Sequence, residues 1–217
     1  MAVDPPAMGE EMNHGPPTAP RQAASVILVR GGDHALELLL VKRNPAASFM
    51  GGVWVFPGGA VDEGDHSGAD PHRSAAVREL AEEAGVTGID ADALVRFSRW
   101  ITPALVRVRF DTHFFVAALP AGQEARPDGE ECVDARWLGA RSALDAHEAG
   151  ELQLVFPTIR HLERLGEFRS AEELLTHARE HEKDIAAVLP RVLVAGGIAR
   201  VVLPGEPGYD ATDDPAI

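Results

Sequence analysis

The chain has 217 residues, of which 45% are hydrophobic, so it is long enough to bury one good core with at most a small appendage. It carries 20 Lys and Arg against 34 Asp and Glu, a formal net charge of −14. Such a surface repels nucleic acid and anionic membranes, and we expect neither as a partner. The single cysteine, Cys132, excludes an internal disulfide and is expected to be a small buried strand residue.

The first half of the chain alternates strand-like runs with turn residues. Residues 1–20 are rich in Pro, Gly, Met and acid, and we predict a disordered tail there. Two strands, Ala23 to Val29 and Leu36 to Lys42, are expected around a turn at Gly31 to His34. Further strands are predicted over Val53 to Phe56, Arg96 to Ile101, Phe110 to Leu119 and Glu131 to Leu138.

The last third of the chain changes to helical patterns. Helices are predicted over Ser142 to Gly150, Phe156 to Leu165 and Ser170 to His181, where Ser170 and Glu173 have the spacing of a capping box. Val192 to Val194 and Ala199 to Leu203 flank two glycines, a pattern that predicts a hairpin. We therefore predict an α/β fold in which residues 21–210 form a single domain and residues 211–217 a tail.

Between these parts lies a strand, a glycine loop and an acidic helix. Pro57, Gly58 and Gly59 follow a β-rich run, as in a tight loop whose backbone approaches another group closely. Asp70 and Pro71 then form the N-cap and first position of a helix of about four turns.

Three carboxylates share one face of this helix. Glu79, Glu82 and Glu83 are three and four residues apart, a spacing at which like charges repel. A divalent cation would compensate that repulsion, and carboxylate oxygens suit Mg²⁺ or Mn²⁺ better than zinc. The alternative is a solvated acidic face, as on most Glu-rich turns.

The unit resembles the Nudix box, G-x5-E-x7-R-E-U-x-E-E-x-G-U, where U is a bulky aliphatic residue. The residues that match the pattern are Gly59, Arg78, Glu79, Leu80, Glu82, Glu83, Gly85 and Val86. Asp65 stands where the family has Glu, and twelve residues instead of seven separate it from Arg78. The five extra residues, placed within His66 to Arg73, lengthen a loop at little entropic cost, so the fold should survive.

The resemblance implies a Nudix fold, with a mixed β-sheet sandwiched between helices, here with extra C-terminal helices and a hairpin. It also implies that Glu79, Glu82 and Glu83 hold Mg²⁺ or Mn²⁺ together with the carbonyl of Gly58. Arg78 would orient Glu79 through a charge-assisted hydrogen bond. The implied reaction is attack of water on a phosphorus of a nucleoside diphosphate linked to another group.

Other residues are candidates for the general base and for substrate binding. Either a helix Glu or a downstream loop carboxylate would take the proton from water, and Glu130 and Glu131 are the downstream candidates, with exposed loop acids as the alternative. Arg43 would bind the substrate phosphates, unless it forms a surface ion pair. Phe56 and Gly59 are also expected at the substrate.

The group attached to the diphosphate is suggested by a second resemblance. Leu39 to Arg43, followed by Gly52 and the Phe56 to Gly59 run, is similar to the extra motif of coenzyme A diphosphatases, except that Ser48 replaces a second basic residue. Trp100 to Pro103, Phe110 to Phe115 and Leu203 to Gly205 resemble the peroxisomal-type branch, but the chain ends without a Ser-Lys-Leu address. No signal peptide or membrane span is visible, and we expect a cytoplasmic enzyme acting on coenzyme A or an acyl-coenzyme A.

Several alternatives remain open at this point. ADP-ribose and NAD(H) are competing substrates, because the same helix serves all of them. A non-hydrolytic Nudix-fold sensor of a nucleotide-like ligand is the alternative of another class, although sensors of that kind usually lose helix carboxylates. His177 and His181 have a spacing that can bind zinc, but a solvated face is the favoured interpretation. A homodimer is possible.

Overall fold

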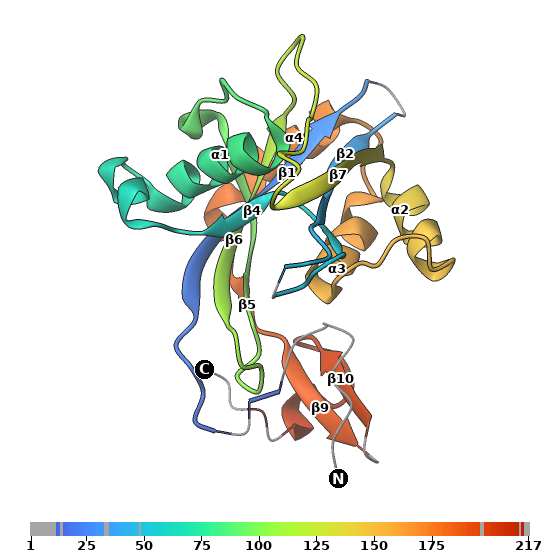
Figure 1. Cartoon of the computed structure of the whole chain (residues 1–217). Coiled ribbons are helices and arrows are strands. Elements are labelled where there is room, and N and C mark those ends of the chain that lie inside the picture. Colours follow the sequence, from blue (N-terminus) through green and yellow to red (C-terminus); the bar gives the residue numbers. More distant parts are fainter. Residues whose placement is uncertain are drawn as a thin grey trace.

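A central mixed β-sheet, covered by helices on both faces, forms the body of the molecule (Figure 1). The computed structural model describes residues 12–13, 15–32, 35–47, 49–195, 198–212 and 214. The strands of this sheet are β1 (Arg21–Arg30), β2 (Glu37–Arg43), β3 (Trp54–Val55), β4 (Gly58–Ala60), β5 (Val95–Ile101), β6 (Phe110–Ala118), β7 (Cys132–Leu138) and β8 (Ala187–Val188). A separate hairpin contains β9 (Arg191–Ala195) and β10 (Ile198–Val202).

The helices are unevenly divided between the two faces. They are α1 (Pro71–Ala84), α2 (Ala140–Glu148), α3 (Phe156–Leu165) and α4 (Ala171–His181), with short 3₁₀ turns at Glu63–Ser67, Ala91–Ala93, Glu182–Asp184 and Tyr209–Ala211. Figure 1 shows α1 on one side of the sheet and α2 and α3 on the other. The expected arrangement, a mixed sheet between helices with extra C-terminal helices and a hairpin, is confirmed.

Strand β1 is the centre of the sheet. It runs parallel to β6 along its whole length, from Arg21 opposite Phe110 to Val29 opposite Ala118. Its first half also pairs with β4 and its last two residues pair with β2, both antiparallel. The pocket described below is lined by Arg21 and by the three residues of β1 that pair with β4.

The two faces of β1 belong to two separate hydrophobic cores. Val26 and Leu28 point to the α1 side and pack with Leu80, whereas Ile27 and Val29 pack on the other side with Leu162 and the helices α2 to α4. This alternation follows from the two-residue period of a strand. Arg21, Ala23 and Ser25 therefore share the face that carries α3 and α4.

Two strands were not expected from the sequence. The glycine segment was predicted as a loop, which is wrong for Gly58–Ala60, because these residues pair with Ala23–Ser25 as β4. Glycine-rich residues have low strand propensity, so only this long-range pairing reveals the strand. A Cβ on Gly58 would lie 2.4 Å from the Ala24 carbonyl oxygen, and the close approach therefore requires glycine. The short β8 was also missed.

The terminal segments contact the body of the molecule. Thr18 accepts a hydrogen bond from Arg109 at 2.6 Å, and Asp214 accepts from the backbone N–H groups of Leu105 and Val192. The predicted hairpin is confirmed as β9 and β10, while its Gly196–Gly197 turn and the Asp33–His34 turn lie outside the described residues. The bounds of a single domain over residues 21–210 remain a prediction.

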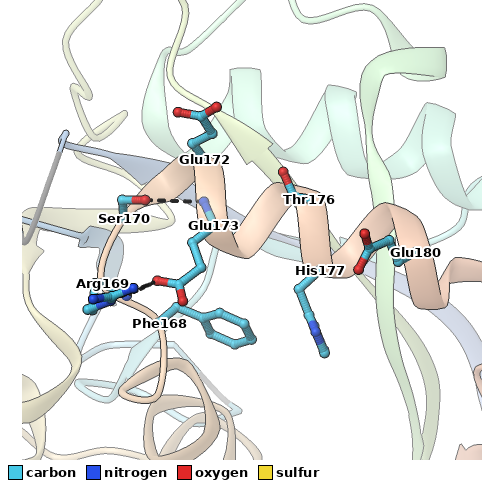
Figure 2. Close-up of a pocket in the computed structure, with 8 residues that line it drawn as sticks. All are labelled: Phe168, Arg169, Ser170, Glu172, Glu173, Thr176, His177 and Glu180. Carbon is cyan, nitrogen blue, oxygen red and sulfur yellow. Dashed lines mark hydrogen bonds and ion pairs between the residues drawn. The ribbon is translucent and has the colours of Figure 1, made fainter.

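Helix α4, the acidic helix near the C-terminus, begins with a capped first turn (Figure 2). Ser170 caps it by accepting a hydrogen bond from the backbone N–H of Glu173 at 3.1 Å. The carboxylate of Glu173 accepts from the backbone of Arg169, one residue before the cap, at 2.8 Å. His177 and His181 stack at 4.2 Å on this half-exposed surface. Across the described part of the chain, no helix is long and apolar enough to cross a membrane.

Candidate active site

Helix α1 has the ends that its sequence predicts. The Asp70 side chain accepts hydrogen bonds from the backbone of His72 at 3.1 Å and Arg73 at 3.4 Å, with Pro71 at the first helical position. Gly85 ends the helix with φ of 64°, a left-handed conformation that favours glycine. The carboxylate-bearing turn therefore lies in the last half of a helix that is fixed at both ends.

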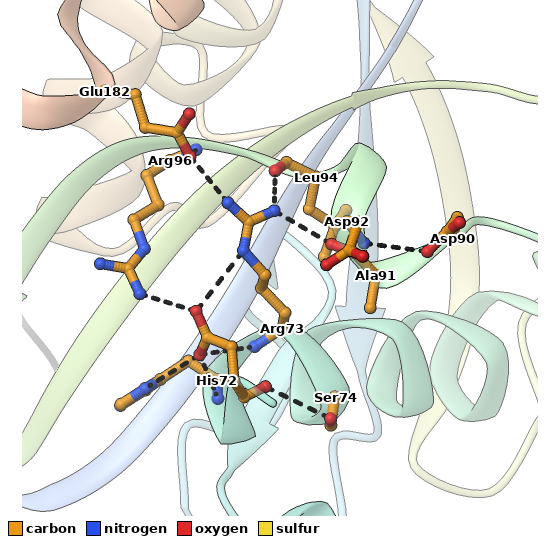
Figure 3. Close-up of polar contacts among 10 residues, drawn as sticks. His72, Arg73, Ser74, Asp90, Ala91, Asp92, Leu94, Arg96 and Glu182 are labelled. Atoms are coloured by element: carbon orange, nitrogen blue, oxygen red, sulfur yellow. Dashed lines mark hydrogen bonds and ion pairs between the residues drawn. The ribbon is translucent and has the colours of Figure 1, made fainter. Parts of the chain in front are cut away.

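A polar network with residues far along the chain anchors the start of α1 (Figure 3). Arg73 contacts the carbonyl oxygens of Ala91 and Leu94 and donates to Glu182, the residue after α4, at 2.7 Å. Arg96 of β5 donates to the Asp70 cap at 2.7 Å. This network ties α1 to the C-terminal helices.

Two glycines of β4 make room for two carboxylates of α1. A Cβ on Gly59 would lie 2.3 Å from Oε1 of Glu79, so only glycine leaves space for that carboxylate. The backbone N–H of Gly58 donates to Oε2 of Glu83 at 2.9 Å. The side chains of Glu79 and Glu83 are 12% and 2% exposed, which is unusual for carboxylates and requires compensation.

Arg78 supplies part of that compensation. Its Nη1 donates to Glu79 at 2.8 Å and to Glu82 at 2.9 Å, and its Nη2 donates to the carbonyl of Ala60 at 2.9 Å. Asp65, which replaces the family's Glu, is buried and accepts from Arg78 with both oxygens, at 3.3 and 3.0 Å. The shorter carboxylate therefore holds Arg78 in this chain.

The buried carboxylates have raised pKa values. Burial raises the pKa of Glu83 to about 7, with a further contribution from the nearby charge of Glu79, although Gly58 and Arg43 oppose it. Burial also raises the pKa of Glu79, against the lowering effect of Arg78. The negative charges of Glu79 and Glu83 are therefore only partly compensated by their neighbours, and a bound cation would stabilise the ionised carboxylates.

The oxygen atoms of these carboxylates and of the Gly58 carbonyl suit a hard divalent ion chemically, but the side chains are not arranged around one common point. Carboxylates together with a backbone carbonyl are the ligands that Mg²⁺ and Mn²⁺ prefer. Among the described residues, however, no three Asp, Glu, His or Cys side chains converge as metal ligands do. Glu82 is 59% exposed and turned toward Arg78, so it would have to rotate to join Glu79 and Glu83.

A pocket of about 360 Å³ opens beside these carboxylates, on the face of the sheet that carries α3. Glu79, Glu83, Gly58 and Gly59 line one part of it, whereas Glu82 does not line it. Its other lining residues are Arg21, Ala23, Ala24, Ser25, Arg43, Phe49, Met50, Val55, Phe56, Ala60, Thr102, Phe110, Thr112, Phe114, Glu131, Val155, Pro157 and Thr158. A nucleotide-sized ligand can therefore reach the carboxylates.

The two downstream acids are separated by the structure. Glu131 lines the pocket, and its charge raises the pKa of both Glu79 and Glu83. Glu130 does not line the pocket; its carbonyl accepts from Asn44 at 2.7 Å. Of the two candidates, only Glu131 is placed beside the α1 carboxylates.

Arg43 also lies in the pocket, at the end of β2. Its Nη1 is 3.5 Å from Oε1 of Glu83, and its buried Nε has no hydrogen-bond partner within the described residues. An orphaned buried donor beside a cavity is a natural contact for an anionic ligand. Phe56 lines the same cavity, while Ser48 lies outside the described residues.

The pocket contains residues that the sequence did not single out. Arg21, Phe49 and Met50 come from the edge of a predicted strand and from a loop, without any motif in common. Met50 has φ of 52°, an uncommon backbone conformation for a residue with a side chain. No pattern in the sequence indicates that these segments meet.

Comparisons with known proteins agree with this geometry. A family model described as the NUDIX domain matches residues 19–156. A solved structure of a NUDIX hydrolase from Alicyclobacillus acidocaldarius is 29% identical and superposes with a TM-score of 0.65, over 73% of this chain and 96% of that one.

Two curated relatives also match. The putative nudix hydrolase 7 of Caenorhabditis elegans is 30% identical over 69% of this chain, which spans 61% of that relative's length. The acyl-coenzyme A diphosphatase NUDT19 of Homo sapiens is 24% identical over 89% of this chain and 81% of its own.

Proposed function

The chain belongs to the Nudix hydrolase family, and on that premise we propose that it hydrolyses the diphosphate bond of coenzyme A or an acyl-coenzyme A. The observation that carries the reaction type is the pair of buried carboxylates, Glu79 and Glu83, packed against β4 beside an open pocket. The substrate is supported by the motif that runs from Leu39 through Arg43 to Gly59 and by the similarity to an acyl-coenzyme A diphosphatase.

The family's dependence on divalent metal ions fits these residues. We propose that Glu79, Glu83 and the carbonyl of Gly58 hold Mg²⁺ or Mn²⁺, with Glu82 joining them. A bound ion of this kind neutralises phosphate charge and lowers the pKa of bound water. Arg78, itself held by Asp65, keeps the Glu79 carboxylate oriented through its 2.8 Å hydrogen bond.

The remaining roles concern the substrate and the proton. Arg43 would place its guanidinium against the diphosphate, using the Nε that has no other partner among the described residues. Glu131 would accept the proton of the attacking water at a carboxylate oxygen, with a carboxylate of α1 as the alternative base. Glu130, outside the pocket, becomes the weaker candidate.

The direct test is product analysis by mass spectrometry. Coenzyme A, acetyl-coenzyme A, ADP-ribose, NADH and a nucleotide sugar would each be incubated with Mg²⁺ or Mn²⁺ in ¹⁸O-labelled water. Release of 3′,5′-ADP and a phosphopantetheine is the expected result, and the position of ¹⁸O shows which phosphorus is attacked. The Glu83→Gln variant, prepared in the same way, measures contaminating activity.

Other results would redirect the proposal. AMP from ADP-ribose or NADH, with coenzyme A intact, would contradict the coenzyme A assignment but keep the hydrolase. Tight binding of a ligand without any turnover would favour a sensor instead. The location in the cell and the oligomeric state remain predictions, a cytoplasmic protein and a possible homodimer.

A further inference from the structure

The pocket carries positive charge at two separate places. Among the described residues that line it, Arg43 and Arg21 are the arginines and there is no lysine. Arg43 lies 3.5 Å from Glu83 and belongs to the carboxylate end. Arg21, the first residue of β1, belongs to a different part of the pocket and has no role in the chemistry described so far.

Strand pairing places Arg21 well away from the carboxylates. Ala24 of β1 is opposite Gly59, the glycine that makes room for Glu79. Arg21 precedes Ala24 by three residues, a separation of about 10 Å along a strand. Arg21 and Ala23 share the pocket face of β1, because side chains two residues apart point to the same side.

Arg21 is exposed and, among the residues that the structure describes, differs from the arginines near it in having no partner. Arg99 donates to Asp111 with two nitrogens, and Arg109 donates to the carbonyls of Thr102 and Thr18. Within the described part of the chain, the Arg21 guanidinium forms no hydrogen bond and no ion pair. The chain has a net charge of −14, yet none of the acids that the structure describes forms an ion pair with this arginine.

The surroundings of Arg21 suit a nucleoside. Phe110 is its register partner on the parallel strand β6, and the Phe49 ring packs on Phe110 with centroids 6.0 Å apart. Thr112, two residues further along β6, adds a hydroxyl to the same wall. The acidic lining residues, Glu79, Glu83 and Glu131, all belong to the other end.

We propose that Arg21 is a specificity residue that binds a phosphomonoester on the ribose of the substrate, while the diphosphate lies at the carboxylate end. This inference rests on the proposed function and deepens it, because it selects substrates with two separate anionic groups. The 3′-phosphate of coenzyme A and the 2′-phosphate of NADPH share this chemistry. Substrates without such a group, such as ADP-ribose and NADH, would leave Arg21 unused.

A kinetic comparison tests the role of Arg21. Values of kcat/KM would be measured for coenzyme A and dephospho-coenzyme A, which differ by the 3′-phosphate, and for NADPH and NADH, which differ by the 2′-phosphate. The wild-type protein should prefer either coenzyme A over dephospho-coenzyme A or NADPH over NADH. The preference in kcat/KM should be about ten- to hundredfold, as expected for a charge-assisted contact. Arg21→Met should abolish that preference by lowering kcat/KM for the phosphorylated member.

A matched control and a second readout separate this effect from folding. Arg141→Met replaces an exposed arginine of α2, outside the pocket, and should change neither member of either pair. Calorimetric titration with 3′,5′-ADP, 2′,5′-ADP and AMP measures the same preference without turnover. One bisphosphate should bind at least tenfold more tightly than AMP to the wild type and to Arg141→Met, but not to Arg21→Met.

The two proposals fail in different ways. If coenzyme A is cleaved but neither kinetics nor binding changes in Arg21→Met, the role of Arg21 is overturned and the proposed function stands. If coenzyme A and dephospho-coenzyme A are both inert, the coenzyme A assignment fails. A bisphosphate preference that Arg21→Met removes would then still support the phosphomonoester site, and equal binding of the three nucleotides would overturn it.

Discussion

Helices α1 and α4 carry similar acidic sequences in different surroundings. In α1 the Glu83 side chain is 2% exposed and receives the backbone N–H of Gly58. In α4, Glu172 and Glu180 are exposed along the edge of an open pocket (Figure 2). Acidic spacing alone therefore does not distinguish a metal-binding helix from a solvated one; what differs is whether a neighbouring strand removes the carboxylates from water.

The two helices are also connected. Glu182, directly after α4, accepts from Arg73 near the start of α1. The C-terminal helix thus contributes to the placement of α1, although Glu172, Glu173 and Glu180 of α4 line a different pocket from the one beside Glu79.

The largest expected difference between the two helices is catalytic. Glu83→Gln should lower kcat by about a thousandfold, since the loss of a metal ligand costs about 4 kcal/mol of transition-state stabilisation. Glu180→Gln in α4 should leave kcat unchanged. Steady-state kinetics with circular dichroism as a folding control measures both, and equal activity of the two variants would remove the distinction.

Gly59 sharpens the comparison, because it is the strand residue directly beside the Glu79 carboxylate, whereas Glu172 and Glu180 of α4 are exposed. Gly59→Ala would place a Cβ 2.3 Å from Oε1 of Glu79 and should displace that carboxylate, lowering kcat by about a hundredfold. Gly64→Ala is the matched control, since a Cβ there has no atom within 4 Å. Full activity of Gly59→Ala would show that Glu79 need not hold this position.

The layer of α3 and α4 contains its own buried titratable group, His161. Its ring contacts the Ser98 hydroxyl and the Pro157 carbonyl, each at 2.6 Å. Burial lowers the pKa of His161 to about 4 from its ordinary 6.5. As pH falls, the unfolded chain therefore protonates His161 at a higher pH than the folded protein does. The contribution of the neutral His161 to the free energy of unfolding is complete above pH 6.5 and declines toward pH 4.

At pH 5 the loss from His161 amounts to about 2 kcal/mol of unfolding free energy. Urea unfolding of the wild type and of His161→Gln at pH 7.5 and 5 isolates the contribution of His161 to this loss. The wild type should lose more stability between these pH values than the variant, whatever the variant's absolute stability. Parallel losses would assign the acid sensitivity to other groups.

The smallest effect concerns the connection between the helices. Arg73→Met removes contacts to Glu182 and to two backbone carbonyls, and should lower the free energy of unfolding by about 1–2 kcal/mol. Arg169→Met removes an exposed ion pair of α4 and should cost less than about 0.5 kcal/mol. Similar losses in chemical denaturation would mean that the Arg73 network contributes no special support.

Much of the fold could be predicted because its signals are local. The cap at Asp70, the stop at Gly85 and the bounds of Phe156–Leu165 follow from residues close in sequence. Strand β4 escaped prediction because it exists only through pairing with β1.

Part of the candidate site could also be predicted from local spacing. Glu79 and Glu83 were found from their spacing, and the structure places both in the pocket. The choice of Glu131 over Glu130, the contact between Asp65 and Arg78, and the presence of Arg21 depend on how distant segments meet. Sequence spacing within one helix carries no information about these contacts.

We propose above that the carboxylates of α1, buried against β4, hold a divalent ion. Calorimetric titration of Mn²⁺ into the wild type, Glu83→Gln and Glu180→Gln tests it without requiring a substrate. We predict saturable binding to the wild type and to Glu180→Gln, weakened at least tenfold in Glu83→Gln, a change of about 1.4 kcal/mol. Equal affinity in all three proteins would contradict the claim.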